Sequence, residues 1–375
     1  RKPEILFATI AAGGGHVAGA RAMAEAVERH YPGRFELRVS DYMKDVGITG
    51  LDRFHKDAWR RALRHPVLAR AGQRLIDAFP RPTIAAQRRI LRGFARAAAE
   101  DLEKRDPLLV VSNHGLITAG LAEAQHRYGL KVRVLTFATE PFNISAYWGE
   151  PRADRVLVAS EEGRRRLLRF GVPADRMTVV GRPVRGAFLN APAKREARRR
   201  LRLEDRFTCL VSLGGEGVGG GPERVVRALL DAGVQVVVLA GRNATLRTEL
   251  LELARPRDRL VVEGFVEDVA SRLAASDVFV GKAGPSSVYE ALAVGRPVLA
   301  TGYAGLNERG VAQFVERAGL GRYVGSTAAL VREVRRYAGE PALLEEVARR
   351  CRDLDLAGST ERFAHEIVHY ALSGA

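Results

Sequence analysis

The stretch ATIAAGGGHVAGARAMAEAVE, residues 8–28, decides the fold. An apolar run ends in three glycines and a histidine, and an alanine-rich run with helical spacing follows at once. Glycines let the chain turn sharply and let a ligand approach the backbone. The first turn of a helix offers unpaired N–H groups and a partial positive charge. The stretch therefore predicts a strand, a glycine turn and a helix, of the kind that binds phosphate groups.

The common nucleotide-binding motifs do not fit this turn. It lacks the GxGxxG spacing of dinucleotide-binding turns, and no P-loop lysine follows. His16 adds a different reading, because the positive end of a helix disfavours imidazolium and leaves a neutral ring that suits a general base. A single histidine is more often structural, so that alternative stays open.

The rest of the chain repeats the alternation of strand and helix. Short, continuous apolar runs are typical of buried parallel strands. In the first half they are residues 4–11, 107–114, 131–139 and 154–160, and in the second half 207–215, 234–241, 260–266, 277–284 and 296–302. The pattern predicts an α/β protein with two parallel sheets. The Gly- and Pro-rich segment 181–194 marks the junction, so we expect domains over 1–185 and 186–355.

Composition narrows the partners and the compartment. The chain has 375 residues and a formal net charge of +16, which favours an anionic partner such as nucleic acid, an anionic lipid surface or a phosphorylated substrate. The alternative is a general preference for arginine, because the basic residues are scattered. The only cysteines, Cys209 and Cys351, form neither a metal motif nor a disulfide framework, which fits a reducing cytoplasm. No apolar run is long enough to span a membrane.

The segment 51–81 interrupts the alternation. Apolar residues fall at helical spacing on either side of Pro66, and arginines fill much of the rest. A basic helix with aromatic residues on its apolar face is typical of helices that lie in a membrane interface. The residues expected to touch a membrane are Phe54, Trp59, Arg60, Arg61 and Arg64. The alternative is a pair of helices that dock on the N-terminal core and leave a basic face in solvent.

Further loops in the second half are of a ligand-binding type. They are residues 213–221, 241–243, 263–268 and 281–292. In the last, we expect the hydroxyls of Ser286 and Ser287 to cap a helix that holds a diphosphate, and Glu290 to accept hydrogen bonds from a ribose. A serine pair at a helix start is by itself usually only a cap. Four such loops at the carboxyl ends of parallel strands, where α/β sheets bind ligands, are a stronger signal.

Taken together these motifs resemble a known enzyme family. The segments AAGGGHVAGARA, GGEGVGGGP, AGRN, EGFVED and KAGPSSVYEALAVGRPVLATGYAGLNERG are similar, in this order, to those of monogalactosyldiacylglycerol synthases and bacterial diacylglycerol glucosyltransferases. These are inverting glycosyltransferases with two Rossmann-like domains facing a deep cleft, the GT-B architecture. The resemblance covers residue 5 to about residue 325. By analogy, residues 356–375 form a helix that returns to the N-terminal domain.

The resemblance implies roles for individual residues. His16 matches a candidate catalytic base, and Glu140 stands where the family usually has an aspartate that assists this base or replaces it. The acceptor side is expected to include Gly14, Gly15, Asn113 and His114. The donor side is expected to include Arg185, Gly214, Gly215, Gly217, Asn243, Phe265, Val266, Gly284, Ser286, Ser287, Glu290, Asn307 and Glu308. Asn307 replaces a family glutamine, which leaves the sugar open between galactose, glucose and N-acetylglucosamine.

The resemblance also implies the partners. We expect a UDP-sugar donor, a diacylglycerol-type acceptor, an anionic membrane surface on the cytoplasmic face of the cell membrane, and neither a metal nor another cofactor. Asp353 and Asp355 form a DxD pattern, but they lie far beyond the donor motifs and fit a solvated face better. The alternatives are a lipid-linked peptidoglycan precursor N-acetylglucosaminyltransferase and, behind it, a UDP-sugar epimerase. Nucleic-acid-binding proteins and nicotinamide oxidoreductases lack support, because their motifs are missing.

Overall fold

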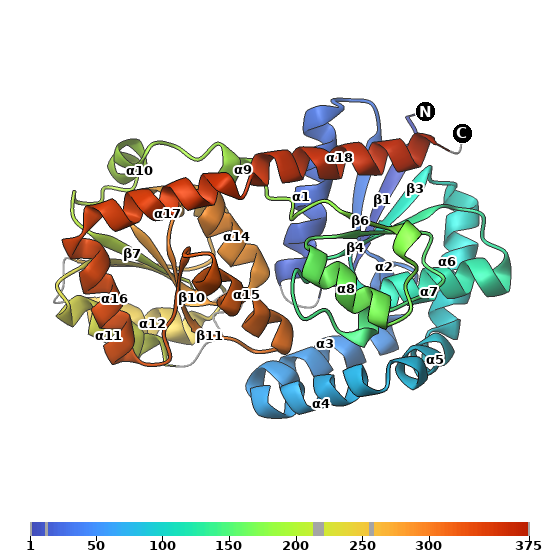
Figure 1. The fold of residues 1–375 in the computed structure, drawn as a ribbon, viewed down its shortest axis with the longest axis horizontal. Coiled ribbons are helices and arrows are strands. Elements are labelled where there is room, and N and C mark those ends of the chain that lie inside the picture. Colours follow the sequence, from blue (N-terminus) through green and yellow to red (C-terminus); the bar gives the residue numbers. More distant parts are fainter. Residues whose placement is uncertain (1, 12–13, 213–220, 255–258, 374–375) are drawn as a thin grey trace. The chain divides into compact units, whose positions relative to one another are not determined.

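The computed structural model describes residues 2–11, 14–212, 221–254 and 259–373. The chain forms two compact units (Figure 1). Unit 1 comprises Arg1–Arg185, Ala304–Gly310 and Leu356–Ala375, and unit 2 comprises Gly186–Tyr303 and Val311–Asp355. Each unit has its own parallel sheet.

The sheet of unit 1 has, in its described part, six strands in the order β2-β1-β3-β4-β5-β6. All neighbouring strands are parallel. The strands are β1 (Glu4–Thr9), β2 (Glu36–Asp41), β3 (Leu109–Ser112), β4 (Val134–Ala138), β5 (Arg155–Val158) and β6 (Met177–Val179). Helices follow most of these strands, as crossover connections between parallel strands require.

The helices of unit 1 lie on both faces of this sheet. They are α1 (Gly14–His30), α2 (Tyr42–Asp45), α3 (Thr49–Arg64), α4 (Pro66–Ala78), α5 (Pro80–Ile90), α6 (Arg92–Arg105), α7 (Gly115–Tyr128), α8 (Glu161–Arg169), α18 (Leu356–Leu372) and the short η1 (Ala146–Trp148) and η2 (Ala174–Arg176). Alternate residues of β1 point to opposite faces of the sheet and pack against different helices. Ile5 and Phe7 pack into one core with α1 and α18, whereas Leu6 and Ala8 pack into another with α6 and α7. Because both faces are buried, the strand sequence is continuously apolar.

Unit 2 repeats this plan. Its described part has a six-stranded parallel sheet in the order β12-β11-β10-β7-β8-β9. The strands are β7 (Thr208–Ser212), β8 (Gln235–Leu239), β9 (Leu260–Glu263), β10 (Val278–Lys282), β11 (Val298–Gly302) and β12 (Gly321–Tyr323). The helices are α9 (Gly186–Leu189), α10 (Lys194–Arg200), α11 (Pro222–Asp231), α12 (Ala244–Ala254), α13 (Val269–Ala275), α14 (Pro285–Ala293), α15 (Leu306–Arg317), α16 (Thr327–Gly339) and α17 (Pro341–Asp353), with the first residues of α15 counted in unit 1.

Both sheets have a point at which the strand order reverses. In unit 1 the chain runs from β1 outward to β2 and then returns to β3, and in unit 2 it runs from β7 to β9 and then returns to β10. Open α/β sheets bind ligands outside the carboxyl ends of the strands at this point. The prediction of two Rossmann-like parallel sheets is therefore confirmed. At the reversal in unit 2, β7 and β10 approach so closely that a Cβ on Gly281 would lie 2.4 Å from the carbonyl oxygen of Ser212.

Candidate active site

Three neighbouring strands of unit 1 end in the residues that the sequence pointed to. His16 lies in the first turn of α1, which follows β1, and Gly14 and Gly15 are the first residues of that helix. Asn113 and His114 follow β3 directly, and Glu140 comes soon after β4. Because these strands are adjacent and parallel, their carboxyl ends bring the side chains to the point of strand reversal.

The backbone of Asn113 orients the ring of His16. The Nδ1 atom of His16 lies 3.2 Å from the carbonyl oxygen of Asn113, and the side-chain amide of Asn113 donates a hydrogen bond of 2.7 Å to the carbonyl of His16. A carbonyl oxygen only accepts, so this contact places the proton on Nδ1 and leaves the lone pair on Nε2. Burial lowers the pKa of His16 to about 4, so the ring is neutral near pH 7. This is the form that accepts a proton from a hydroxyl.

Two further histidines surround His16. The ring centroid of His114 lies 4.8 Å from that of His16, and His55 of α3 packs edge-on against His114 at 5.0 Å. Burial lowers the pKa of both His55 and His114, and the neighbouring histidines lower the pKa of His114 further. The three rings therefore form a neutral cluster, the histidine cluster. His55 was not singled out from the sequence, because only the packing of α3 brings it here.

Tyr147 closes the histidine cluster on another side. Its hydroxyl lies 3.3 Å from Nε2 of His114 and its ring is edge-on to that histidine. The close packing requires a glycine next to His114, since a Cβ on Gly115 would lie 2.7 Å from the carbonyl oxygen of Tyr147. Burial and the nearby Glu140 raise the pKa of Tyr147 well above its ordinary value, so its hydroxyl stays protonated. Tyr147 was not singled out from the sequence either, because it lies in the short helix η1, in the loop between β4 and β5, which carries no motif.

Glu140 stands at the start of this loop. Its carboxylate accepts a hydrogen bond of 3.4 Å from the backbone N–H of Ser145. Burial raises the pKa of Glu140 to about 7, and the Ser145 N–H opposes the rise. The loop is held by Asp77 of α4, which accepts hydrogen bonds from the Ser145 hydroxyl and the Ala146 N–H. An ion pair of 2.7 Å between Asp77 and Arg166 holds that carboxylate in place.

A buried arginine lies close to His16, but it is not the one that the sequence favoured. Arg182 is buried and donates a hydrogen bond to the carbonyl of Thr139, and its charge is among the causes that lower the pKa of His16. Arg185 is half-buried and is the last residue of the N-terminal segment of unit 1. The motif GRPVRGAF contains both arginines, and spacing alone does not distinguish them.

An ion network connects the glycine turn to α3. Asp41, the last residue of β2, accepts a hydrogen bond of 3.0 Å from the backbone N–H of Ala11. The ammonium of Lys56 lies 2.7 Å from the other oxygen of Asp41 and 2.8 Å from Asp52. Helix α3 therefore touches the predicted site twice, through His55 at the histidine cluster and through Lys56 at the turn before His16.

In unit 2, the start of α14 differs from the expectation. Gly284 is the N-cap residue and Pro285 occupies the first helical position, so Ser286 and Ser287 lie inside the first turn. The prediction that the two hydroxyls cap this helix was wrong, because a proline at the first position shifts the cap to the residue before it. Gly284 has no side chain to compete for the N–H groups of the first turn. Glu290 lies one turn further along α14 and is half-buried.

Three other predicted donor residues follow β8 and β9. Asn243 caps α12, and its side-chain oxygen accepts a hydrogen bond of 3.0 Å from the N–H of Leu246. Phe265 is exposed, and the guanidinium carbon of Arg242 lies 4.2 Å from its ring centroid. Val266 is half-buried beside it. The side-chain oxygen of Asn243 is thus occupied by the cap of α12. Phe265 and Val266 lie just beyond the carboxyl end of β9. Gly214, Gly215 and Gly217 lie outside the described residues.

Asn307 and Glu308 lie in a segment that packs within unit 1. The N–H of Leu306 donates a hydrogen bond of 3.1 Å to Gln73 of α4, and the carbonyl of Leu306 accepts one of 3.0 Å from Asn143. Glu308 is buried, and its carboxylate accepts a 2.6 Å hydrogen bond from the N–H of Ala304. The segment that the resemblance links to the sugar is therefore held by α4 and by the loop that begins at Glu140.

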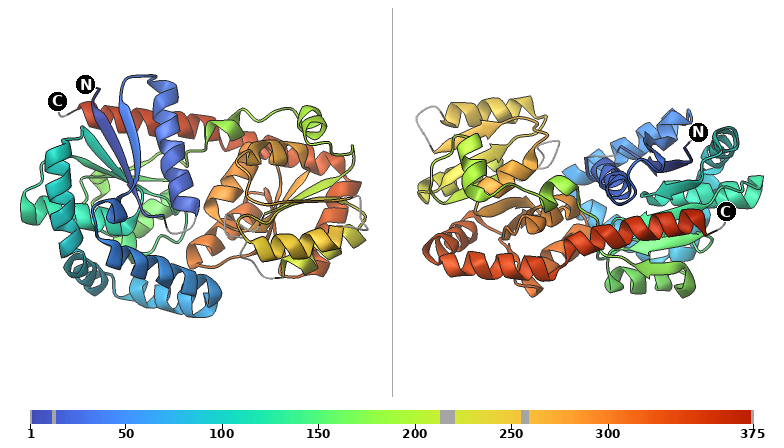
Figure 2. Two further views of the ribbon diagram at one scale, coloured as in Figure 1. Left: turned by 180° about the vertical axis from the view of Figure 1, so that it is seen from behind. Right: turned by 90° about the horizontal axis from the view of Figure 1, so that it is seen from above.

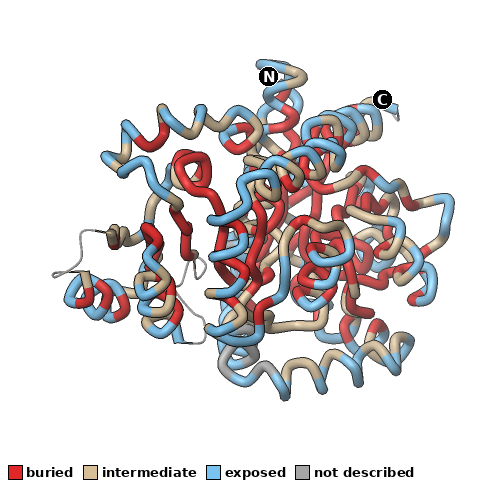
Figure 3. Tube along the Cα trace, turned by 60° about the vertical axis from the view of Figure 1, so that its left-hand side comes forward, coloured by how far each residue is buried: buried red, intermediate tan, exposed pale blue. Residues whose placement is uncertain are grey.

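Helices α3 and α4 lie side by side in Figures 1 and 2, and many of their residues are exposed (Figure 3). Several large apolar residues of this segment are among them. The exposed fractions are Phe54 67%, Val67 68%, Leu68 70%, Leu75 64% and Phe79 57%. We call these five residues the apolar surface. Their exposure favours the predicted membrane-facing segment over the alternative of docked helices that leave only a basic face in solvent. Arg60 and Arg61 are exposed nearby on α3, and the side chains of Trp59 and Arg64 lie outside the described residues. Among the described residues, no helix is both long enough and apolar enough to cross a membrane.

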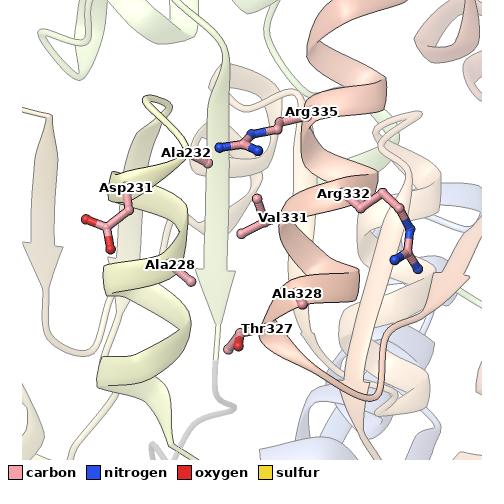
Figure 4. A pocket seen from close by; sticks show the side chains of 8 residues that line it. All are labelled: Ala228, Asp231, Ala232, Thr327, Ala328, Val331, Arg332 and Arg335. Carbon is pink, nitrogen blue, oxygen red and sulfur yellow. The ribbon is translucent and has the colours of Figure 1, made fainter.

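A groove of about 540 Å³ lies elsewhere, between α11 and α16 of unit 2 (Figure 4). Alanines and Val331 form its apolar part, and Asp231, Arg332 and Arg335 lie around it. None of the donor residues expected from the sequence lines this groove. It is therefore separate from the strand ends at which the ligand-type loops of unit 2 gather.

Comparison with known proteins agrees with the fold. Residues 21–185 match the family model Glycosyltransferase Family 4, and residues 223–338 match Glycosyl transferases group 1. A probable chloroplastic monogalactosyldiacylglycerol synthase of Nicotiana tabacum is 26% identical, over 97% of this chain and 71% of that protein.

Solved structures extend this likeness over the whole chain. Anabaena HepE in complex with UDP-glucose has a TM-score of 0.58 at 16% identity and is covered over 100% of both chains. A UDP-GlcNAc 2-epimerase of Neisseria meningitidis has a TM-score of 0.62 at 14% identity, over 99% of this chain and 100% of that one. At identities of 14% and 16%, the likeness to these structures establishes the fold alone. With both family models and the synthase relative, the chain belongs to the GT-B glycosyltransferases and is related to the monogalactosyldiacylglycerol synthases.

Proposed function

We propose that this glycosyltransferase moves a hexose from a UDP-sugar to diacylglycerol at an anionic membrane surface. The apolar surface of α3 and α4 is the observation that carries the choice of a lipid acceptor. Apolar patches of this kind on basic helices fit the interfacial layer of a membrane, where arginines meet anionic headgroups. Helix α3 carries Phe54 of this surface and also His55 of the histidine cluster. A lipid held at the surface would thus have its headgroup near His16.

The donor is proposed to bind at the strand reversal of unit 2. The first turn of α14 presents N–H groups there without competition from the side chain of the N-cap residue. Diphosphate is the ligand that such a helix start favours. HepE is described in complex with UDP-glucose, which supports a UDP-sugar for a chain of the same fold.

The proposed reaction is a single displacement. Nε2 of His16 takes the proton of the acceptor hydroxyl while the hydroxyl oxygen forms a bond to C1 of the sugar. The bond from C1 to the diphosphate oxygen breaks at the same time, and UDP leaves with the electron pair. Attack from the opposite face inverts the anomeric centre. The charge that grows on UDP would be stabilised by the start of α14 and by a basic side chain such as Arg185. We propose that this step needs no metal ion.

The role of Glu140 follows from its pKa of about 7. A carboxyl group with this pKa is partly ionised near neutral pH, when His16 is already neutral. We assign the proton transfer to His16, because its Nε2 lone pair is fixed by the Asn113 carbonyl. Glu140 then acts on the cluster through Tyr147, whose pKa it raises.

A transfer assay tests the whole proposal. Purified protein is mixed with anionic liposomes that contain diacylglycerol, and radiolabelled UDP-galactose, UDP-glucose and UDP-N-acetylglucosamine are offered separately. We expect label in the lipid extract from galactose or glucose. A parallel reaction contains a lipid-linked peptidoglycan precursor instead of diacylglycerol. Label only in that precursor, and only from UDP-N-acetylglucosamine, would overturn diacylglycerol as the acceptor. Conversion of UDP-N-acetylglucosamine without any acceptor would indicate an epimerase and overturn the proposal.

A further inference from the structure

Three potential metal ligands gather at the far end of α1 from His16. His30 is the last residue of α1, and Glu361 and His365 lie one turn apart on α18. One ligand atom from each of the three lies within 4.8 Å of the others. With a rise of about 1.5 Å per residue, His30 is about 21 Å along α1 from His16, so this cluster is separate from the proposed active site.

The ring of His365 is held in an orientation that suits a ligand. Its Nδ1 atom lies 2.5 Å from the hydroxyl oxygen of Tyr31, and its Nε2 atom lies 3.4 Å from the carboxylate of Glu361. If Nδ1 donates its proton to Tyr31, the lone pair of Nε2 faces the same space as the Glu361 carboxylate. Histidine ligands are commonly fixed in this way, with the other ring nitrogen donating to a neighbour.

The ligand set indicates the kind of ion. Two imidazoles and one carboxylate are typical ligands of zinc and of similar divalent transition metals, and three protein ligands leave a position for water. Ligand atoms about 2.1 Å from a tetrahedral ion are about 3.4 Å apart, so separations of up to 4.8 Å in the cluster must shorten by at most about 1.4 Å. Glu361 and His365 have more than half of their side-chain surface exposed, which lets their rotamers adjust without disturbing the core.

We propose that His30, Glu361 and His365 form a binding site for a zinc-class divalent ion that connects α1 to α18. The two helices already pack together in the core of unit 1 through residues such as Met23 and Ile367. An ion that binds the folded state and not the unfolded chain raises the stability of unit 1 in proportion to the logarithm of its concentration. The ion would thus fix the C-terminal helix on the helix that carries His16.

Direct metal binding tests this proposal without any glycosyl transfer. Tag-free protein is treated with EDTA, dialysed and titrated with Zn²⁺ by calorimetry and with Co²⁺ by absorption spectroscopy. We expect one Co²⁺ bound with the visible spectrum of a four-coordinate ion, and a melting temperature of unit 1 that rises with Zn²⁺ concentration.

Variants locate the site. H365A and E361Q should each weaken Zn²⁺ binding at least tenfold, and Y31F should weaken it about tenfold to a hundredfold, the range for partners that orient a ligand. H369A is the matched control, because His369 lies one turn further along α18, is exposed and is not part of the cluster. Equal Zn²⁺ affinity in wild type, H365A and E361Q, or no binding by wild type, would overturn the proposal. E361Q leaves the contact between Tyr31 and His365 in place. Weaker Zn²⁺ binding by this variant is therefore due to the missing carboxylate and not to a folding defect.

Discussion

At the scale of single residues, the candidate site combines side chains that follow neighbouring strands with side chains from other elements. His16 and His114 follow adjacent parallel strands, and the family resemblance placed both on the acceptor side. His55 and Tyr147 reach the same place from α3 and from the short helix η1, whose positions depend on tertiary contacts. The cap of α14 was misassigned because the serine hydroxyls were weighed and the proline before them was not.

His16 is the residue on which the proposed chemistry depends. Replacing it with Gln keeps a polar side chain but removes the base, so we expect transfer to fall about 10²- to 10⁴-fold. The affinity for UDP, measured by calorimetry, should stay unchanged because His16 lies in unit 1 and the proposed UDP site in unit 2. Parallel loss of UDP affinity would instead assign His16 a structural role.

Stability should depend on pH in two opposite ways. Unfolding restores the ordinary pKa of 6.5 to His16 from about 4, so its contribution to stability is complete above pH 6.5 and is lost as pH falls toward 4. Glu140 has a pKa of about 7 when folded and 4.5 when unfolded, so it costs stability as pH rises from 4.5 through 7. In urea unfolding, E140Q should therefore gain more stability over wild type at pH 8 than at pH 5. An equal difference at both pH values would contradict the raised pKa of Glu140.

At the scale of elements, a strand was predicted correctly from the sequence where both of its faces are buried. The strands that are apolar on both faces were recognised, whereas β2, β6 and β12 were not. The sequence of β2, ELRVSD, alternates charged and apolar residues, because this strand lies at the edge of its sheet with its first residue exposed. The other two have only three residues each, too few for a periodic pattern. Helices α3 and α4 were predicted around Pro66, but their exposed apolar surface needed the structure.

The apolar surface can be tested by itself. A triple variant with Val67, Leu68 and Leu75 replaced by Ser should lower the affinity for anionic liposomes at least tenfold, since each side chain gives up its transfer into an apolar layer. These side chains are exposed, so the melting temperature should change little. Leu251→Ser in unit 2 is the control, as another exposed leucine outside this surface. If the triple variant still sediments with liposomes as wild type does, α4 is not the membrane contact.

The ion network between α3 and the glycine turn gives a second test at this scale. In K56M, Asp41 and the buried Asp52 face each other without a cation, so we expect the free energy of unfolding to fall by about 2 kcal/mol. Transfer should fall as well at a temperature where the variant is folded, because Asp41 also holds the N–H of Ala11. K56R should restore both quantities in part, and K44M, at an exposed lysine of α2, should change neither. Full activity of folded K56M would mean that the network only stabilises the fold.

At the scale of the whole molecule, the two units each have their own core. Phe363 of α18 is fully buried in unit 1 and packs edge-on against Phe137 of β4, with ring centroids 4.9 Å apart. We expect F363A to destabilise unit 1 by about 3–5 kcal/mol through the cavity that it leaves. In a chain of two units this appears in urea as a shift of one transition. F279A, at a buried phenylalanine of β10, is the control and should shift the other transition.

The position of α18 sets the order in which the units mature during synthesis. Unit 1 contains the first residues of the chain, yet α18, which covers one face of its sheet, begins only at Leu356. At about 5–20 residues per second, a ribosome needs roughly 9–35 s to proceed from residue 185 to that helix. During this interval α18 does not yet exist, so it cannot bury the apolar side chains of β1, β4 and α1 that it contacts in the folded protein. A nascent chain of this protein therefore leaves this face of unit 1 without α18 until the last part of unit 2 has been made.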